Sequence, residues 1–159
     1  MTVAYVGIGS NLEDPVRQVR DALNELHRLP HTRVVKRSSL YRSAPLGHAA
    51  QPDFINAVAQ LETGLPAERL LEELREIEAR HGRRRSFPNA PRTLDLDVLL
   101  FGSSELDVPG LRIPHPRMHE RAFVLEPLLE LSPDISIPGI GTAKSCLQGC
   151  SQQRTERIG

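Results

Sequence analysis

Two amphipathic stretches, each with a proline near its start, constrain the fold of this chain more than any other sequence feature. In residues 13–29, Asp14 precedes Pro15 and apolar residues then recur with helical spacing; residues 66–82 begin with a proline and end with a glycine. A capping aspartate, a proline at the first helical position and a closing glycine are typical helix boundaries. Both stretches are therefore predicted to be helices with one apolar face.

Segments with the composition of β-strands lie before, between and after these helices. They cover residues 2–9, 32–42, 54–63 and 92–102. The resulting order, β-α-β-β-α-β, predicts an α+β domain of the ferredoxin-like type, with helices packed on a mostly antiparallel sheet. Residues 7–12, GIGSNL, lack the last glycine of a dinucleotide-binding motif and are interpreted as a turn. A shorter helix is expected at 121–131, interrupted by Pro127, and residues 134–159 stay unassigned.

The bulk composition sets the protein class. A length of 159 residues, with 39% hydrophobic and 25% charged residues, predicts a single soluble domain over 1–159, which we expect to be a monomer. No apolar run approaches the ~20 residues of a membrane span, and the start has no signal-peptide pattern, so we expect a cytoplasmic protein. Zero net charge argues against nucleic-acid binding. Cys146 and Cys150 are expected to be free thiols.

Two aspartates, Asp95 and Asp97, open an otherwise apolar strand. Alternate strand residues share a face, so the two carboxylates are expected roughly 6.5–7 Å apart along one face, where they repel each other. They could serve to prevent pairing with other chains. They could also bind Mg²⁺, which takes one or two protein carboxylates and completes its shell with water and phosphate oxygens.

An arginine-rich segment without acids, residues 79–94, comes directly before these aspartates. Its arginines are Arg80, Arg83, Arg84, Arg85 and Arg92. Such a segment can be simply a solvated surface. Arg92 lies only three residues before Asp95, however, and cations next to metal-binding carboxylates suit a polyphosphate that offers oxygens to both.

Weaker candidates follow in a rigid, proline-bearing loop and at two aromatic positions. His115 can be structural, or it can contact phosphate together with the basic residues near it, which are Arg117, His119 and Arg121. Phe54 and Phe123 belong more often to a core than to a stacking site.

Five motifs in order resemble the 6-hydroxymethyl-7,8-dihydropterin pyrophosphokinase family. They are AYVGIGSNL, YRSAPLG, QPDFINAV, RTLDLDVLLFG and IPHPRMHERAFVLEPL, and the resemblance covers about residues 2–133. It implies Mg²⁺-dependent transfer of the β,γ-diphosphoryl group of ATP to the hydroxymethyl oxygen of the pterin, with release of AMP, in folate biosynthesis. ATP and the pterin would then be the partners of this chain.

The resemblance also implies roles for particular residues. Asp95 and Asp97 would hold two Mg²⁺ ions and, with Arg83 and Arg92, carry catalysis. The expected ATP contacts are Leu71, Arg83, Arg85, Arg92, Val98, Arg112, His115 and Arg121. The expected pterin contacts are Ser43, Leu46, Phe54, Asn56 and Phe123. Without metal, at least one pKa of the aspartate pair is expected to be raised.

Two other classes of function stay open at this point. A different metal-dependent phosphotransferase or hydrolase would use the same carboxylates but would not release AMP in a pterin-dependent reaction. A ferredoxin-like module that binds RNA or a small regulator would need paired aromatic residues on its central strands. The strand segments 2–9 and 93–100 lack that pattern.

Overall fold

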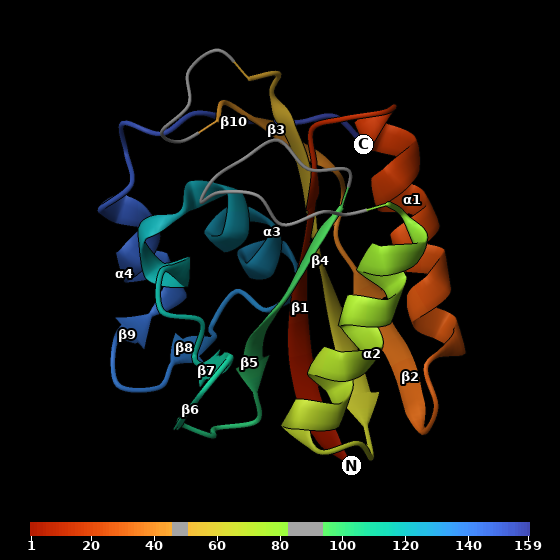
Figure 1. The fold of residues 1–159 in the computed structure, drawn as a ribbon. Helices are drawn as coiled ribbons and strands as arrows, with labels where there is room; N and C mark the ends of the chain where they lie inside the picture. Colours follow the sequence, from red (N-terminus) through yellow and green to blue (C-terminus); the bar gives the residue numbers. More distant parts are fainter. Residues whose placement is uncertain (46–50, 83–93) are drawn as a thin grey trace.

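The computed structural model describes residues 1–45, 51–82 and 94–159, and consists of a central sheet with helices on both faces (Figure 1). Six strands form this sheet in the order β10-β3-β4-β1-β5, with β2 also paired to β4, and every pairing is antiparallel. The strands are β1 (Thr2–Ser10), β2 (Thr32–Arg37), β3 (Tyr41–Ser43), β4 (Phe54–Thr63), β5 (Asp95–Phe101) and β10 (Thr155–Arg157). The predicted α+β class is confirmed.

Helices cover both faces of the sheet. The helical segments are α1 (Pro15–Glu25), η1 (Leu26–Arg28), α2 (Ala67–Arg80), η2 (Met118–Glu120), α3 (Ala122–Leu131) and α4 (Ala143–Gln148). Two small hairpins complete the fold: β6 (Leu106–Val108) with β7 (Leu111–Ile113), and β8 (Ser136–Ile137) with β9 (Gly141–Thr142). One core lies between the sheet and α1 and α2, and a second lies on the α3 side.

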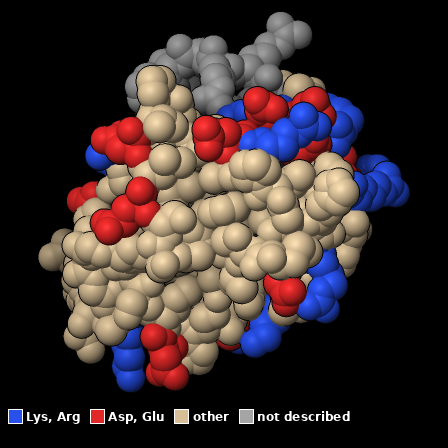
Figure 2. All heavy atoms as spheres, turned by 90° about the horizontal axis from the view of Figure 1, so that it is seen from below, with Lys and Arg blue, Asp and Glu red and all other residues tan. Residues whose placement is uncertain are grey.

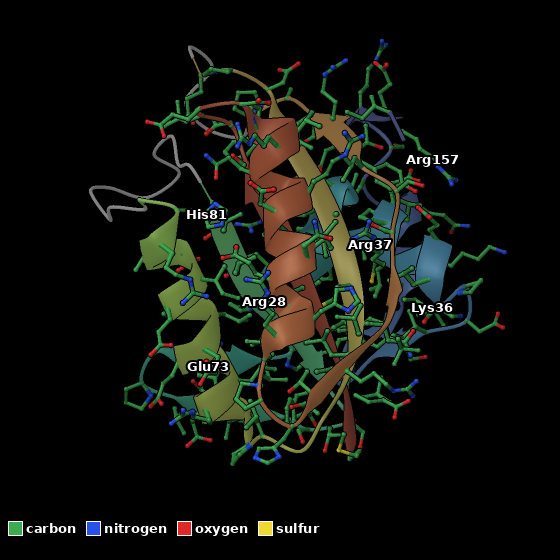
Figure 3. All side chains as sticks on the ribbon, turned by 90° about the vertical axis from the view of Figure 1, so that its right-hand side faces the viewer. Arg28, Lys36, Arg37, Glu73, His81 and Arg157 are labelled. Carbon is green, nitrogen blue, oxygen red and sulfur yellow. The ribbon has the colours of Figure 1, made fainter. Side chains whose placement is uncertain are left out.

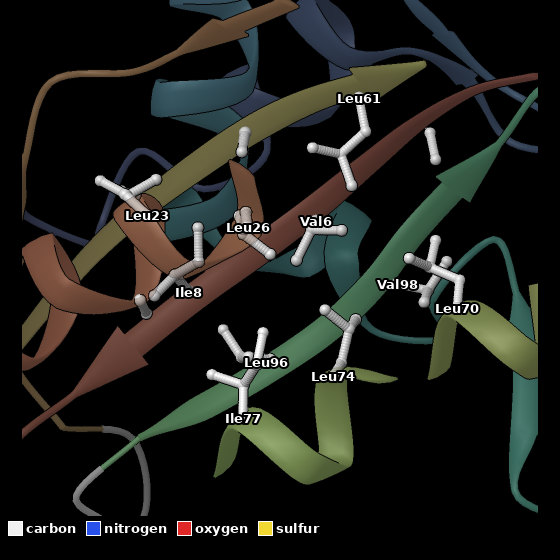
Figure 4. Packing of buried hydrophobic residues seen from close by; sticks show 14 of the residues in the cluster. Val6, Ile8, Leu23, Leu26, Leu61, Leu70, Leu74, Ile77, Leu96 and Val98 are labelled. Carbon is white, nitrogen blue, oxygen red and sulfur yellow. The ribbon is translucent and has the colours of Figure 1, made fainter. Parts of the chain in front are cut away.

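The first two helices begin and end close to where the sequence predicts. The Asp14 carboxylate accepts a hydrogen bond from the backbone N–H of Arg17 at 3.5 Å, so it caps α1 as expected. Helix α2 ends just before Gly82, whose φ of +78° is easily reached by glycine. Leu23 of α1 and Leu70, Leu74 and Ile77 of α2 are buried in one apolar cluster with residues of β1 and β5 (Figure 4).

The end of α2 is also attached to α1 by a side chain. His81 lies there (Figure 3), and its Nε2 is 2.6 Å from Oε2 of Glu25. The chain therefore leaves α2 from a firmly held point just before residues 83–93.

The segment 32–42 is not the single strand that the sequence predicts. It forms β2 and β3, which both pair with β4 and are separated by residues 38–40. Ser38 replaces one rung of the ladder, because its N–H donates to the Val58 carbonyl and its Oγ accepts from the Val58 N–H, each at 2.9 Å. A residue whose side chain can substitute for a backbone group allows this break without loss of hydrogen bonds.

Two further expectations need correction, and the unassigned tail takes up regular structure. Helix α3 continues through Pro127, because burial of its neighbours Leu125 and Leu128 compensates for the lost backbone hydrogen bond. The GIGS part of the expected turn lies in β1, which extends to Ser10. The tail 134–159 forms β8, β9 and α4 on the α3 side of the sheet, and then β10 at the edge of the sheet.

Charged residues of both signs are intermingled on the surface. In the view from below, acidic and basic side chains lie next to one another around a broad area of other residues (Figure 2). This arrangement fits the zero net charge of the chain. No helix among the described residues is both long and apolar enough to cross a membrane.

Candidate active site

A cavity of about 250 Å³ opens on the α3 side of the sheet, where β1, β4 and β5 run next to one another. Asp95 and Asp97 both line it from β5, while Leu96 and Val98 point into the core on the opposite face. The shared face of the two aspartates, expected from strand geometry, is therefore what the structure shows.

Two glycines of β1 form the floor of this cavity. Gly7 lies opposite Asp97, and Gly9 lies opposite Asp95, with Asn56 of β4 on its other side. A Cβ on Gly9 would come within 3.2 Å of the Asn56 Oδ1. The glycines thus leave room between the carboxylates and β4, a role that sequence reasoning missed because it placed them in a turn.

The carboxylate pair carries unfavourable charge in this structure. Burial, followed by the charge of Asp95 and a hydrogen bond with it, raises the pKa of Asp97 to about 8. One of the pair therefore holds a proton near neutral pH unless a cation replaces it, as the sequence analysis predicts. Two hard oxygen donors that need a positive partner fit Mg²⁺, and no group of three or more His, Cys, Asp or Glu residues suited to a metal occurs in the described parts of the chain.

The strand between the aspartates is held by α2. The Leu96 N–H donates to Oε2 of Glu78 at 2.7 Å, and the Leu96 carbonyl accepts from Nη1 of Arg75 at 2.8 Å. Arg75 and Glu78 also pair with each other at 2.9 Å. Helical spacing alone could have suggested this pair on α2, but its contact with Leu96 required the tertiary structure.

His115 faces the same carboxylates from the loop that follows β7. Its Nε2 lies 4.0 Å from Oδ2 of Asp97, and its Nδ1 accepts a hydrogen bond from the Arg117 N–H at 3.1 Å. Burial and the charge of Arg121 lower the pKa of His115 to about 4, so the ring is neutral near pH 7. With Nδ1 acting as acceptor, the proton lies on Nε2, which can donate to an anionic oxygen.

Three of the five residues expected to bind the pterin line the first cavity, namely Phe54, Asn56 and Phe123. Phe54 from β4 and Phe123 from α3 both line it, and Arg121 lies over the Phe123 ring with its Cζ 5.5 Å from the centroid. The Asn56 amide donates to the Ser43 Oγ at 2.7 Å, and both residues are buried.

A second cavity, of about 610 Å³, adjoins the first at Asp97. It is lined by Leu71, Val98 and Arg112, three of the residues expected to contact ATP, and shares Arg75, Asp97 and His115 with the first cavity. The structure therefore brings together two concave surfaces that meet at one carboxylate. Of the remaining expected residues, Leu46, Arg83, Arg85 and Arg92 lie outside the described part of the chain.

Residues 5–133 match the model of the 7,8-dihydro-6-hydroxymethylpterin-pyrophosphokinase (HPPK) family. The chain belongs to this family. It is 48% identical over 154 residues to a 2-amino-4-hydroxy-6-hydroxymethyldihydropteridine pyrophosphokinase of Pseudomonas aeruginosa, covering 97% of this chain and 95% of that relative. A relative of the same description from Haemophilus influenzae is 46% identical, with 87% of this chain and 86% of the relative covered.

Solved structures share the HPPK fold. A Plasmodium falciparum HPPK-DHPS structure superimposes with a TM-score of 0.70 at 13% identity, covering 94% of this chain and 43% of that one. Another HPPK-DHPS structure, in complex with substrates, gives a TM-score of 0.74 at 11% identity, covering 93% of this chain and 43% of that one. This chain thus spans less than half the length of those proteins, and at these identities the likeness concerns the fold alone.

Proposed function

We propose that the protein transfers the β,γ-diphosphoryl group of ATP to the hydroxymethyl oxygen of 6-hydroxymethyl-7,8-dihydropterin, giving AMP and the pterin diphosphate in folate biosynthesis. Membership of the HPPK family supports this reaction. The observation that carries it is the meeting of two cavities at Asp97. One cavity suits a flat heterocycle and the other a nucleoside, with carboxylates and basic groups between them.

The first cavity is the proposed pterin site. Phe54 and Phe123 offer rings to a planar heterocycle, and each good stack contributes about 0.5–1.5 kcal/mol beyond the burial of area. Asn56 can donate and accept hydrogen bonds, as the polar edge of a pterin requires. Its amide is oriented by Ser43. The family resemblance adds the backbone near Ser43 and Leu46 as further contacts.

The second cavity is the proposed nucleoside site, with Leu71 and Val98 as apolar walls and Arg112 at its rim. The triphosphate then extends toward His115 and Arg121. Neutral His115 donates from Nε2, and Arg121 provides a guanidinium that can form two parallel hydrogen bonds to phosphate oxygens. Arg83, Arg85 and Arg92 complete the proposed set of phosphate contacts, as the family resemblance implies.

Asp95 and Asp97 are the proposed ligands of Mg²⁺. The family resemblance implies that two Mg²⁺ ions bind. Bound Mg²⁺ would neutralise the carboxylates and the charge that develops on the transferred diphosphoryl group. The hydrogen bonds of Arg75 and Glu78 with the Leu96 backbone hold this part of β5, so that the carboxylates of Asp95 and Asp97 are directed into the cavity. One of the two aspartates is the proposed acceptor of the hydroxymethyl proton, because both line the cavity proposed for the pterin. We also propose that the enzyme acts in the cytoplasm as a monomer.

A product assay tests this function. The protein is mixed with ATP, Mg²⁺ and reduced 6-hydroxymethylpterin, and the nucleotide product is separated by chromatography. AMP that forms only when the pterin and Mg²⁺ are both present is the expected result. ADP, or nucleotide turnover without the pterin, would reject the proposal in favour of another phosphotransferase or a hydrolase.

A further inference from the structure

The C-terminal segment 150–158 lies outside the stretch that matches the family model, yet it contacts strand β3 and the start of α3, the helix that contributes Phe123 to the first cavity. Strand β10 pairs with β3, placing Thr155 opposite Ser43, and α4 packs beside α3 (Figure 1). The segment starts from the buried Cys150, and the N–H of Gln153 donates to the Cys150 carbonyl at 2.9 Å. Gln153 thus lies between α4 and β10 in the chain, with its side chain at the start of α3.

The side-chain amide of Gln153 forms hydrogen bonds with the backbone on both sides of Arg121. Its Oε1 accepts from the N–H of Ala122 at 2.9 Å, and its Nε2 donates to the carbonyl of Glu120 at 2.7 Å. These two backbone groups belong to the peptide units on either side of Arg121. The amide therefore pairs with the backbone on either side of Arg121 as a neighbouring strand would, and its contact with Ala122 spans 31 residues of sequence.

The contact with Gln153 supplies a capping hydrogen bond at the start of α3. Arg121 is the N-cap residue of α3, with an extended backbone at φ −122° and ψ 105°, and its own side chain makes no capping hydrogen bond. The first N–H groups of a helix have no partner within the helix. Gln153 satisfies one of them from outside and also limits the two dihedral angles of Arg121.

We propose that Gln153 is a positioning residue that fixes the direction of the Arg121 guanidinium toward the phosphates of the nucleotide. Arg121 lines the first cavity, so a rotation about its backbone would move the charged end of a long side chain by far more than the backbone itself. This inference rests on the proposed function for the identity of the ligand. The contacts that carry it do not depend on that function.

The test is a double-mutant cycle on binding, because binding can be measured even in variants that do not turn over. The probe is a non-hydrolysable ATP analogue with Mg²⁺, titrated by calorimetry into the full chain. Gln153→Ala is expected to weaken binding about tenfold in the wild-type background. In the Arg121→Ala background the same change is expected to cost less than about twofold, because the group that Gln153 positions is gone.

The neighbouring variant Gln152→Ala serves as the matched control, because Gln152 is exposed on the same segment. It is expected to bind the analogue like the wild type. Wild-type affinity in Gln153→Ala would overturn the proposal. An equal loss of affinity in both backgrounds would also overturn it, since this would indicate a general structural role.

A second variant covers the case in which Gln153→Ala does not fold. Gln153→Glu keeps the size of the side chain and the acceptor for the Ala122 N–H, but it places a carboxylate oxygen against the Glu120 carbonyl. It is expected to weaken analogue binding only when Arg121 is present, and unchanged affinity would again overturn the proposal.

Hydrogen exchange at the Ala122 amide gives a readout that is independent of ligand and activity. Exchange is expected to be faster in Gln153→Ala than in the wild type or in Gln152→Ala, and unchanged exchange would contradict the cap. If the wild type forms no AMP while exchange and the binding cycle behave as expected, the proposed reaction fails and the positioning role stands.

Discussion

Two adjacent rows of residues cross strands β4, β1 and β5, and one row is apolar whereas the other is polar. Ala57, Ile8 and Leu96 lie next to one another on the face toward α1 and α2, and all three are buried in the apolar core. One position along, Asn56, Gly9 and Asp95 form the adjacent row on the opposite face and line the first cavity. The comparison teaches that the row toward α1 and α2 maintains the fold, whereas the adjacent row on the other face, beside the second core, is polar and opens into a cavity.

The largest effect is expected for a substitution of Asp97 in the cavity, which should lower activity while it raises stability. Asp97→Asn is expected to lower kcat/KM by at least about 10²–10³-fold, because the site loses a carboxylate that binds metal and phosphate charge. The same change should raise the free energy of unfolding of the metal-free protein by about 1–2 kcal/mol at pH 8, because it removes a repelled, half-buried charge.

Steady-state kinetics and urea denaturation in EDTA measure the two effects of Asp97→Asn. Asp134→Asn, at an exposed site far along the chain, is the control and should change neither quantity. A fully active Asp97→Asn enzyme would contradict the proposed metal site and would favour a role for this acid in preventing aberrant strand pairing.

The apolar face should show the reverse behaviour. Leu26 is completely buried against the sheet, and Leu26→Ala is expected to lower the free energy of unfolding by about 2–5 kcal/mol through lost burial and a cavity. The kcat of the folded fraction should stay close to that of the wild type. A proportional fall in kcat at a temperature where the variant is fully folded would show that the two faces are coupled.

Gly9→Ala adds one methyl group to the polar row. The added Cβ would lie 3.2 Å from the Asn56 Oδ1, which should displace the amide that faces the proposed pterin and weaken pterin binding about tenfold. Fluorescence titration with the pterin measures this. The neighbouring change Ile8→Val, which points to the other face, should cost about 0.5–1.5 kcal/mol of stability and leave pterin affinity unchanged.

The smallest effect is a pH dependence of stability in the metal-free protein. The pKa of Asp97 is raised to about 8, so this group lowers stability progressively as pH rises from about 4 to about 8. The pKa of His115 is lowered to about 4, so this group raises stability as pH rises from about 4 to its ordinary value near 6.5.

The two trends oppose each other below pH 6.5, and only the Asp97 trend remains above it. The free energy of unfolding in EDTA should therefore fall by about 1 kcal/mol between pH 6.5 and 8. Urea denaturation at several pH values measures it. The fall should be absent in Asp97→Asn, and its persistence there would assign it to another group.

The sequence by itself determined the local features of this protein. Helix boundaries at Asp14 and Gly82, the α+β order of elements and the shared face of Asp95 and Asp97 follow from periodicity, capping and strand geometry, which involve neighbouring residues only. The five motifs were sufficient for the family. These features could be predicted because each is a property of a short stretch of chain.

The tertiary structure alone decided which distant residues meet. Three contacts join segments that no local pattern connects. Gly9 pairs with Asp95, Glu78 accepts a hydrogen bond from the Leu96 N–H, and Gln153 forms hydrogen bonds with the peptide groups on both sides of Arg121. Hydrogen bonds of this kind depend on strand register and on where a chain end returns to the sheet. Both are set by the packing of the whole domain rather than by the preferences of any one segment.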